Sequence, residues 1–266
     1  MFRGNLSVVQ KHYGMMKVSI ITVVYNGRDT IRDAIESVLS QDYDNVEYIV
    51  VDGASRDGTT EVVKSYGERI SKFISEPDKG IYDAMNKGVG LATGDVVGIL
   101  NADDFYNDNR VLTRVVEKFQ ASACEGVYGD LEYINPVDTK KVERYWKAGV
   151  YVKNSFLLGW MPPHPSFFVK RDVYERLGTF NTELRSAADY EIMLRFIHKH
   201  GILLDYIPEV LVKMRSGGQS NISVKNRLKG NWEDKLAWKL NGLKPFFFTT
   251  WIKPLKKVSQ FFIRKS

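Results

Sequence analysis

Residues 95–104 read Asp95-Val96-Val97-Gly98-Ile99-Leu100-Asn101-Ala102-Asp103-Asp104. The apolar run Asp95–Leu100 is typical of a buried strand in an α/β sheet, so the two carboxylates that follow lie where the strand ends at a ligand crevice. Adjacent carboxylates repel each other unless a cation lies beside them, and oxygen ligands suit a hard divalent ion carrying a diphosphate. An Asp-Asp turn that only ends a strand would have the same sequence, so this stretch alone leaves both alternatives open.

Apolar runs and helical patterns alternate around this stretch. Runs at Val18–Val24, Val46–Val51, Ile70–Ile74 and Asp95–Leu100 predict strands, and apolar residues recur at helical spacing between and after them. This alternation implies right-handed crossovers and an α/β fold, with a mostly parallel, Rossmann-like sheet flanked by helices.

The second half of the sequence is less regular. It predicts strands at residues 127–134, 141–146 and 166–169, a proline-rich loop at residues 162–165, and an amphipathic helix at residues 188–200. A chain of 266 residues suits one large domain, or one domain with an appendage.

The N-terminus and the cysteine count favour a cytoplasmic protein. Residues 1–16 show no clear period, which is typical of a disordered extension or of a start codon placed too far upstream. No secretory segment precedes the first strand, and no apolar run approaches the ~20 residues that span a bilayer. Cys124 is the only cysteine, which excludes an internal disulfide framework and fits a reducing compartment.

The net charge of +6 is concentrated in a tail, residues 225–266. This tail contains 11 Lys or Arg against Glu233 and Asp234, a net of +9, so the preceding residues carry a net of −3. It also holds three of the five Trp residues. A basic, aromatic and helical tail is typical of an element that lies on a membrane surface, although a helix packed on the body or an oligomer contact would have the same composition. A nucleic-acid contact fits the tail too, but it leaves the acidic pair without a role.

Four polar segments follow the predicted strands and therefore lie at one edge of the sheet. They are Thr22–Asn26, Asp52–Gly58, Glu76–Gly80 and Asn101–Asp104.

Single residues in these segments suit a nucleotide. Asp52 could accept hydrogen bonds from a base or ribose, Tyr25 could stack on a ring, and Lys79 at a helix start could meet a phosphate. Taken alone, each has an ordinary alternative as a turn residue, a surface aromatic or a solvated charge.

Several well-known motifs are missing. Only one glycine follows the first strand, so the dinucleotide-binding fingerprint is absent, and no phosphate-binding G-x-x-x-x-G-K-[ST] loop occurs. The four His residues lack a zincin spacing, and no G-x-S-x-G elbow occurs. These absences disfavour dehydrogenases, P-loop kinases, zincins and α/β-hydrolases.

Four segments resemble family 2 glycosyltransferases. They are Val18–Asn26, Val51–Thr59, Asp78–Gly88 and Asn101–Asp104, in the family's order. The resemblance implies a GT-A fold, a nucleotide-sugar donor with UDP as its nucleotide, Mn²⁺ or Mg²⁺, and inversion at the anomeric carbon.

The resemblance extends over residues 17–215 and implies a glycosyltransferase domain at residues 17–224. Its nucleotide-binding half is expected at residues 17–120 and its acceptor half at residues 121–224. The tail then follows as a separate element.

The resemblance also assigns donor-binding roles. Thr22, Tyr25 and Asn26 would line the nucleotide pocket, and Asp52 would contact the base. Lys79 would lie near the base or the diphosphate.

Carboxylates would supply the metal site and the base. Asp104 is expected to bind the metal and Asp103 the ribose or the metal shell, although the family's D-x-D element here reads Ala-Asp-Asp. Asp189 resembles the family's catalytic acidic residue and precedes an amphipathic helix, whose N-terminus favours an ionised carboxylate. A plain N-terminal cap is the alternative for Asp189, and Glu191 is the second candidate for the base.

Two further residues have open roles. His164 could touch the metal, the diphosphate or the acceptor, or have no catalytic role. Arg215 lies in a glycine-containing segment that could close over the donor diphosphate.

We therefore expect a metal-dependent inverting transferase that extends a glycan or a lipid-diphosphate-linked acceptor at the inner face of the cell membrane, in cell-surface polysaccharide synthesis. A non-catalytic sugar-nucleotide-binding scaffold on the same fold is the main alternative. A sugar-nucleotide pyrophosphorylase would need a glycine-rich, basic loop after the first strand, and Val24–Arg28 does not supply one.

Overall fold

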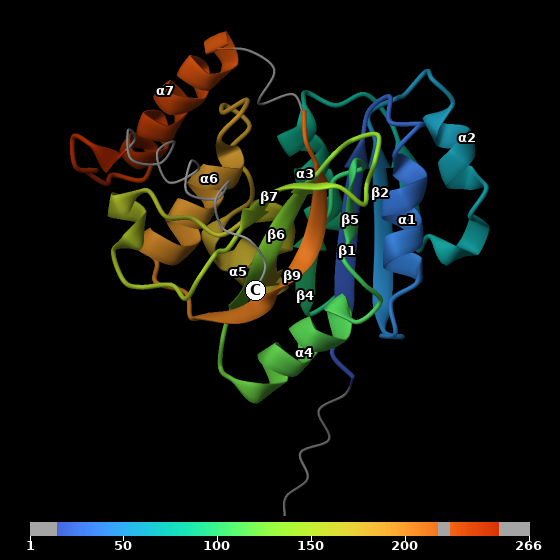
Figure 1. Cartoon of the computed structure of the whole chain (residues 1–266), viewed down its shortest axis with the longest axis horizontal. Helices are drawn as coiled ribbons and strands as arrows, with labels where there is room; N and C mark the ends of the chain where they lie inside the picture. Colours follow the sequence, from blue (N-terminus) through green and yellow to red (C-terminus); the bar gives the residue numbers. More distant parts are fainter. Residues whose placement is uncertain (1–14, 218–223, 250–266) are drawn as a thin grey trace, which may run out of the picture.

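The computed structural model describes residues 15–217 and 224–249, without the side chains of residues 224–231 (Figure 1). Most of the predicted extension, and the tail from residue 250 onward, lie outside the described residues.

The first hundred residues form a parallel βαβ array. Its elements are β1 (Val18–Val24), α1 (Ile31–Leu39), β2 (Val46–Asp52), α2 (Thr59–Lys64), the short turn η1 (Gly67–Arg69), β3 (Lys72–Ser75), α3 (Ile81–Leu91) and β4 (Val96–Ile99). β1 pairs in parallel with β2 on one side and with β4 on the other, and β2 pairs in parallel with β3. The predicted alternation of strands and helices is confirmed. The runs of β1, β2 and β4 are apolar enough to be buried on both faces, whereas β3 at the edge of the sheet is only partly buried.

The rest of the chain completes a mixed sheet. Its elements are β5 (Asp104–Tyr106), α4 (Val111–Ala121), β6 (Gly126–Ile134), β7 (Val142–Trp146), η2 (Ser155–Leu158), η3 (His164–Ser166), β8 (Phe167–Lys170), α5 (Arg171–Leu177), α6 (Ala188–Met193), η4 (Leu194–Lys199), β9 (Leu204–Arg215) and α7 (Val224–Leu240). The nine-stranded sheet has the order β3-β2-β1-β4-β8-β6-β9-β5, with β7 paired to β6. β6 and β9 are parallel, whereas β8, β7 and β5 pair antiparallel with their neighbours.

The α/β prediction is therefore confirmed, and the parallel pairing belongs mainly to the first half. The predicted loop at residues 162–165 contains the start of the short helix η3.

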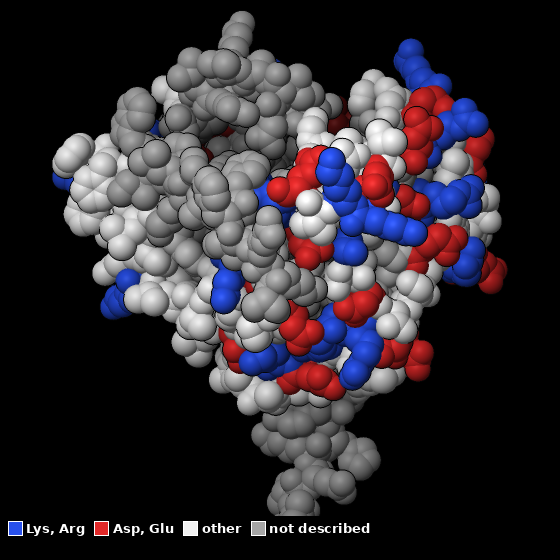
Figure 2. Space-filling model, viewed as in Figure 1, with Lys and Arg blue, Asp and Glu red and all other residues white. Residues whose placement is uncertain are grey.

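Charged side chains are spread unevenly over the molecule. On the face seen in Figure 2, acidic and basic side chains intermingle over the half that contains α1 and α4, whereas the described surface of the opposite half is mostly uncharged. Ion pairs such as Arg114–Asp108, at 2.7 Å, lie in the half that contains α1 and α4.

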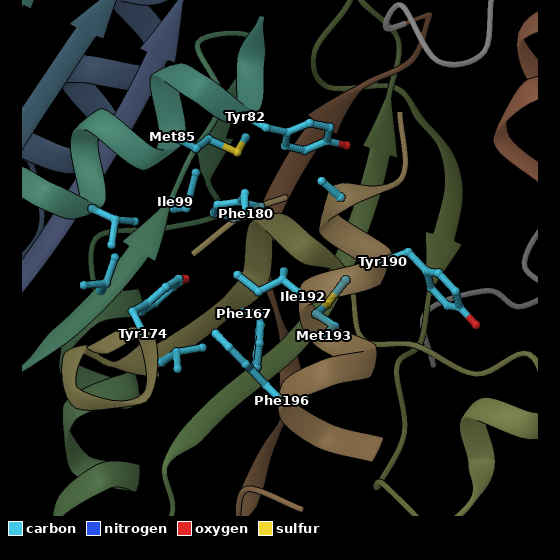
Figure 3. Packing of buried hydrophobic residues seen from close by; sticks show 14 of the residues in the cluster. Tyr82, Met85, Ile99, Phe167, Tyr174, Phe180, Tyr190, Ile192, Met193 and Phe196 are labelled. Carbon is cyan, nitrogen blue, oxygen red and sulfur yellow. The ribbon is translucent and has the colours of Figure 1, made fainter. Parts of the chain in front are cut away.

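Two apolar layers cover the faces of the sheet. One layer packs α1, α2 and α4 against it. The other packs α3, α5, α6, η4 and α7, with aromatic residues such as Phe167, Tyr174 and Phe196 at its centre (Figure 3).

The described start of the tail packs on the body. Trp238 of α7 is 1% exposed, and its indole Nε1 donates to the Tyr190 hydroxyl at 2.9 Å. The buried Glu233 carboxylate accepts from the Ser186 amide at 2.7 Å. The described part of α7 from Trp232 onward therefore belongs to the same packed body as α6. Among the described residues, no helix combines the length and the apolar character needed to cross a bilayer.

Two glycines of α3 make a matched test of core packing. A methyl group at Gly88 would overlap the Ile21 side chain of β1, whereas one at Gly90 would meet nothing within 4 Å. We expect Gly88→Ala to lower the free energy of unfolding by about 1–3 kcal/mol through overpacking. Gly90→Ala should raise it by up to about 1 kcal/mol through helix propensity. Urea unfolding measures both; equal effects would contradict the close approach of α3 to β1.

Candidate active site

The strand order reverses beside β1, because β2 and β3 lie on one side of it and β4 on the other. In open α/β sheets, ligands bind beyond the carboxyl ends of the strands at such a point. Here those ends are Tyr25-Asn26 after β1 and Leu100–Asp104 after β4.

Asn26 holds the loops after β1 and β2 together. Its backbone has a φ of 50°, its amide donates to Ser55 Oγ at 2.8 Å, and its Oδ1 accepts from the Arg56 amide at 3.0 Å. Asn tolerates this left-handed conformation better than most residues. The locked loop leaves Tyr25 65% exposed beyond the sheet edge.

Asp52 has an acceptor atom without a partner. Its side chain is fully buried, and Oδ2 accepts from Ser75 Oγ at 2.6 Å and from the Ser55 amide at 3.0 Å. Oδ1 is buried and has no hydrogen-bond partner among the described residues. An unpaired buried acceptor costs free energy, so an N–H or O–H group of a ligand at this position would be stabilising.

The absence of a side chain at Gly53 lets Asp78 lie close to the loop that follows β2. A methyl group at Gly53 would lie 2.5 Å from Asp78 Oδ2 and 3.3 Å from the Tyr25 ring. Tyr25, Asp52 and Asp78 therefore converge, and the exposed Lys79 follows directly. Of the three converging residues, Tyr25 and Asp52 are predicted for the nucleotide, whereas sequence reasoning missed Asp78.

Asp104 is the most strongly perturbed carboxylate of this edge. It is fully buried at the start of β5, and Oδ1 has no hydrogen-bond partner in the described part of the chain. Asn101 Nδ2 donates to Oδ2 at 3.3 Å, and Asn101 Oδ1 is itself buried and unpartnered. Burial, and then the neighbouring Asp103 charge, raise the pKa of Asp104 well above its usual value. Burial also raises the pKa of Asp103.

Arg215 supports this turn from the end of β9. Its Nη1 donates to the backbone oxygen of Asp103 at 2.7 Å, and its Nη2 forms an ion pair with Asp33 of α1. Arg215 is 7% exposed. Arg215 therefore fixes the position of the acidic pair, while its charge is already shared with Asp33.

Asp189 lies beside two residues of other elements. Tyr82 of α3, which projects toward α6 in Figure 3, donates its hydroxyl to Asp189 Oδ1 at 3.2 Å. Burial lowers the pKa of His164, and the Asp189 charge partly offsets this effect. His164 also packs edge-on against Phe180 at 5.9 Å. His164 is therefore neutral at pH 7 and lies within electrostatic reach of Asp189.

The Asp104 and Asp189 carboxylates both affect the pKa of Tyr133 in β6. Burial raises its pKa, Arg144 lowers it, and the charges of both Asp104 and Asp189 raise it. The Arg144 guanidinium lies 3.6 Å from the centre of the Tyr133 ring. Asp104 and Asp189 thus both lie within electrostatic reach of one tyrosine. Sequence reasoning missed this residue, since its only signal is a place in an apolar strand.

Two predicted residues are placed differently. Thr22 is fully buried in the layer beneath α1 and accepts from the Tyr48 hydroxyl at 3.1 Å, so its side chain points into the core instead of a pocket. Glu191 is 3% exposed and forms an ion pair with Arg195 at 3.0 Å, which leaves it little freedom to act as a base.

The acidic edge fits a divalent cation that is only partly held by protein. Within residues 15–217 and 224–249, no group of three or more His, Cys, Asp or Glu converges as a complete metal site. The unpaired oxygens of Asp104 and Asn101 are nevertheless hard ligands in a buried position. A cation at these atoms would take its remaining ligands from a diphosphate and water.

A family model described as glycosyl transferase family 2 matches residues 19–178, more than half of the chain. The chain belongs to this family. The predicted family is thereby confirmed, and the chain is a family 2 glycosyltransferase domain.

Individual relatives agree with the family. An uncharacterised glycosyltransferase of Rickettsia typhi is 30% identical over 204 residues, which are 74% of this chain and 63% of that protein. The chain thus spans less than two thirds of this relative. A PGL/p-HBAD biosynthesis glycosyltransferase of Mycobacterium bovis is 27% identical over 211 residues, which are 77% of this chain and 80% of that protein.

Solved structures share the fold. Staphylococcus aureus TarS in complex with UDP-GlcNAc has a TM-score of 0.66 at 17% identity, over 85% of this chain and 65% of that chain. The mannosyltransferase PcManGT of Pyrobaculum calidifontis, in complex with GDP-Man and Mn²⁺, has a TM-score of 0.65 at 20% identity, over 90% and 72%. The likeness supports the GT-A fold.

The buried Asp104 charge predicts an unusual stability change. Because its pKa is raised on folding, the folded state loses stability as the pH rises from about 4 toward that pKa, and the loss persists above it. In EDTA, Asp104→Asn should therefore be more stable than wild type by about 1–3 kcal/mol at pH 7.5, with a difference that shrinks toward pH 4.

Asp108 is the matched control, because the pKa of this Arg114-paired carboxyl is lowered on folding. Its ion pair contributes stability above about pH 4 that is lost as the pH falls, so Asp108→Asn should be less stable than wild type at pH 7.5. Thermal unfolding across the pH range measures both variants. A destabilised Asp104→Asn would contradict an uncompensated charge at Asp104.

Proposed function

We propose that this protein is a metal-dependent inverting glycosyltransferase that moves a sugar from a UDP-sugar to a hydroxyl of a glycan or lipid-linked acceptor. The buried Asp104 carboxylate, one oxygen of which has no hydrogen-bond partner among the described residues, carries this proposal. It follows β4, the strand beside the strand-order reversal, and lies with Asp189 within electrostatic reach of Tyr133. Donor, metal and acceptor functions would thus meet at one edge of the sheet.

The donor nucleotide would lie between the loops after β1, β2 and β3. The free Oδ1 of Asp52 would accept from the base, and Tyr25 would stack on it, with Asn26 holding the loop. Lys79 would meet the base or the diphosphate. UDP is supported by the complex of the structurally similar TarS with UDP-GlcNAc, whereas PcManGT holds GDP-Man.

Asp104 would hold Mn²⁺ or Mg²⁺, and Asp103 would complete the metal shell or contact the ribose. The bound ion would supply charge neutralisation for the diphosphate that leaves. The complex of PcManGT with Mn²⁺ supports this choice of metal. Arg215 would act indirectly here, by fixing the backbone of Asp103.

Asp189 would be the general base. It would remove the proton of the acceptor hydroxyl while the hydroxyl oxygen attacks the anomeric carbon from the face opposite the diphosphate, which leaves with the electron pair of the broken C–O bond. Tyr82 would orient the carboxylate through its hydrogen bond, and the neutral His164 would border the acceptor.

The acceptor and the cellular place follow from the relatives and the tail. A relative named for PGL/p-HBAD biosynthesis supports a lipid-linked acceptor in the synthesis of surface glycans or glycolipids. The basic tail would hold the protein at the cytoplasmic face of the membrane.

The base assignment predicts a separation of turnover from binding. Asp189→Asn should lower kcat by about 10²–10⁴-fold and leave the affinity for the nucleotide sugar within about twofold of wild type. The exposed Glu183→Gln, six residues earlier, is the control and should keep wild-type rates. Steady-state kinetics with calorimetric donor binding measures both; retained turnover in Asp189→Asn would exclude it as base.

The donor pocket predicts a complementary loss. Asp52→Asn turns the free acceptor into a group that can present an N–H to the base, so the Kd for the donor nucleotide should rise about tenfold or more. The exposed Asp44→Asn is the control. Titration with UDP and GDP, with Mn²⁺ present, measures the change; an unchanged Kd for both would place the nucleotide elsewhere.

A further inference from the structure

Two segments far apart in the sequence expose apolar side chains beside the acceptor half of the site. One is residues 150–158, which include η2, and the other is residues 232–249, the end of α7 and the turn after it. Seven of the thirteen large hydrophobic residues that are exposed in the described part of the chain lie on them. They are Val150, Val152, Leu158, Trp232, Leu240, Phe246 and Phe247. We call the two segments together the apolar rim.

The two segments of the rim pack against each other. Thr249 Oγ1 donates to the backbone oxygen of Leu157 at 2.7 Å. The His198 ring links them a second time, because it lies 6.0 Å from the Phe156 ring and 5.2 Å from the Trp238 ring. Buried anchors thus fix the exposed residues, and the rim is a single surface.

The exposed charged side chains of residues 147–158 and 232–249 are all positive. They belong to Lys147, Lys153, Lys235, Lys239 and Lys244, while the acidic Glu233 and Asp234 are buried. Three of these lysines line an open pocket of about 540 Å³ together with Trp238 and Leu243. The sequence that continues after Thr249 contains five Lys or Arg and no Asp or Glu. Anionic headgroups complement this charge.

The rim borders the proposed base. The ring of Phe156 lies 6.0 Å from that of Tyr190, the residue after Asp189. The same loop continues to His164, which lies within electrostatic reach of Asp189. A molecule held at the rim is therefore close to the acceptor side of the site.

We propose that the apolar rim docks the protein on an anionic lipid bilayer, with residues 150–158 and 232–249 entering the headgroup region together. Exposed aromatic and aliphatic side chains surrounded by lysines are typical of interfacial binding. A second copy of the chain is a poorer occupant, because a symmetric contact would bring the lysines of both copies together. The proposal rests on the proposed function only in that a bilayer-borne acceptor would reach Asp189 from this side.

The test distinguishes membrane contact through residues 150–158 from contact through the tail alone. In the full chain, we would combine Val150→Ser, Val152→Ser and Leu158→Ser, all at exposed positions of the rim. Val137→Ser with Val142→Ser is the matched control, since both valines are exposed outside the rim. The measurement is cosedimentation with vesicles of phosphatidylglycerol and phosphatidylcholine, and with pure phosphatidylcholine, at low and moderate salt.

We expect wild type and the control to bind the anionic vesicles, more weakly at moderate salt and on neutral lipid, and the loop variant to bind about tenfold less. Equal binding of loop variant and wild type would overturn the proposal and leave the tail as the only contact. The proposal would also be overturned if wild type did not bind the vesicles. The same holds if sedimentation velocity showed that wild type is a dimer and that the variant with the three substitutions is a monomer. Vesicle binding needs no turnover, so failure of the proposed enzyme activity would leave this result readable.

Discussion

The uncompensated burial of the Asp104 carboxylate is the constraint on which the rest of the site depends. Arg215, whose charge acts on Asp104, already forms an ion pair with Asp33 and donates to the backbone oxygen of Asp103. A carboxylate removed from water without a full partner raises the free energy of the folded state. A bound cation would remove this free-energy cost, and the removal would contribute to the affinity of the protein for the cation.

Sheet register explains why the Asp104 carboxylate lies within electrostatic reach of Tyr133. Asp104 of β5 pairs with Met214 of β9, and Met214 pairs on its other side with Tyr133 of β6. The three residues form one row across three strands, with neighbouring strands about 4.8 Å apart. β9 therefore joins the strand that contains Asp104 to the strand that contains Tyr133, and Arg215 at the end of β9 forms an ion pair with Asp33 of α1.

The sequence predicts the first half of the fold well because its signals are local. Each buried run is short, and each helix between two runs has its own apolar face. The Asp104–Met214–Tyr133 row joins residues about a hundred positions apart in the chain, and no local pattern encodes such pairing. Thr22 is a case where a local pattern does predict burial: it is two positions from both Ile20 and Val24 along β1, so its side chain lies on the same buried face as theirs.

The segment that contains the proposed base, Asp189, packs against α7. Glu233 accepts from the Ser186 amide just before α6, and Trp238 donates to the Tyr190 hydroxyl just after Asp189. Asp189 is thus bracketed by two contacts from one helix. The outer side of the same helix carries Lys235 and Lys239 of the apolar rim. The helix that carries lysines of the proposed membrane surface is thus the same helix that contacts the residues on both sides of Asp189.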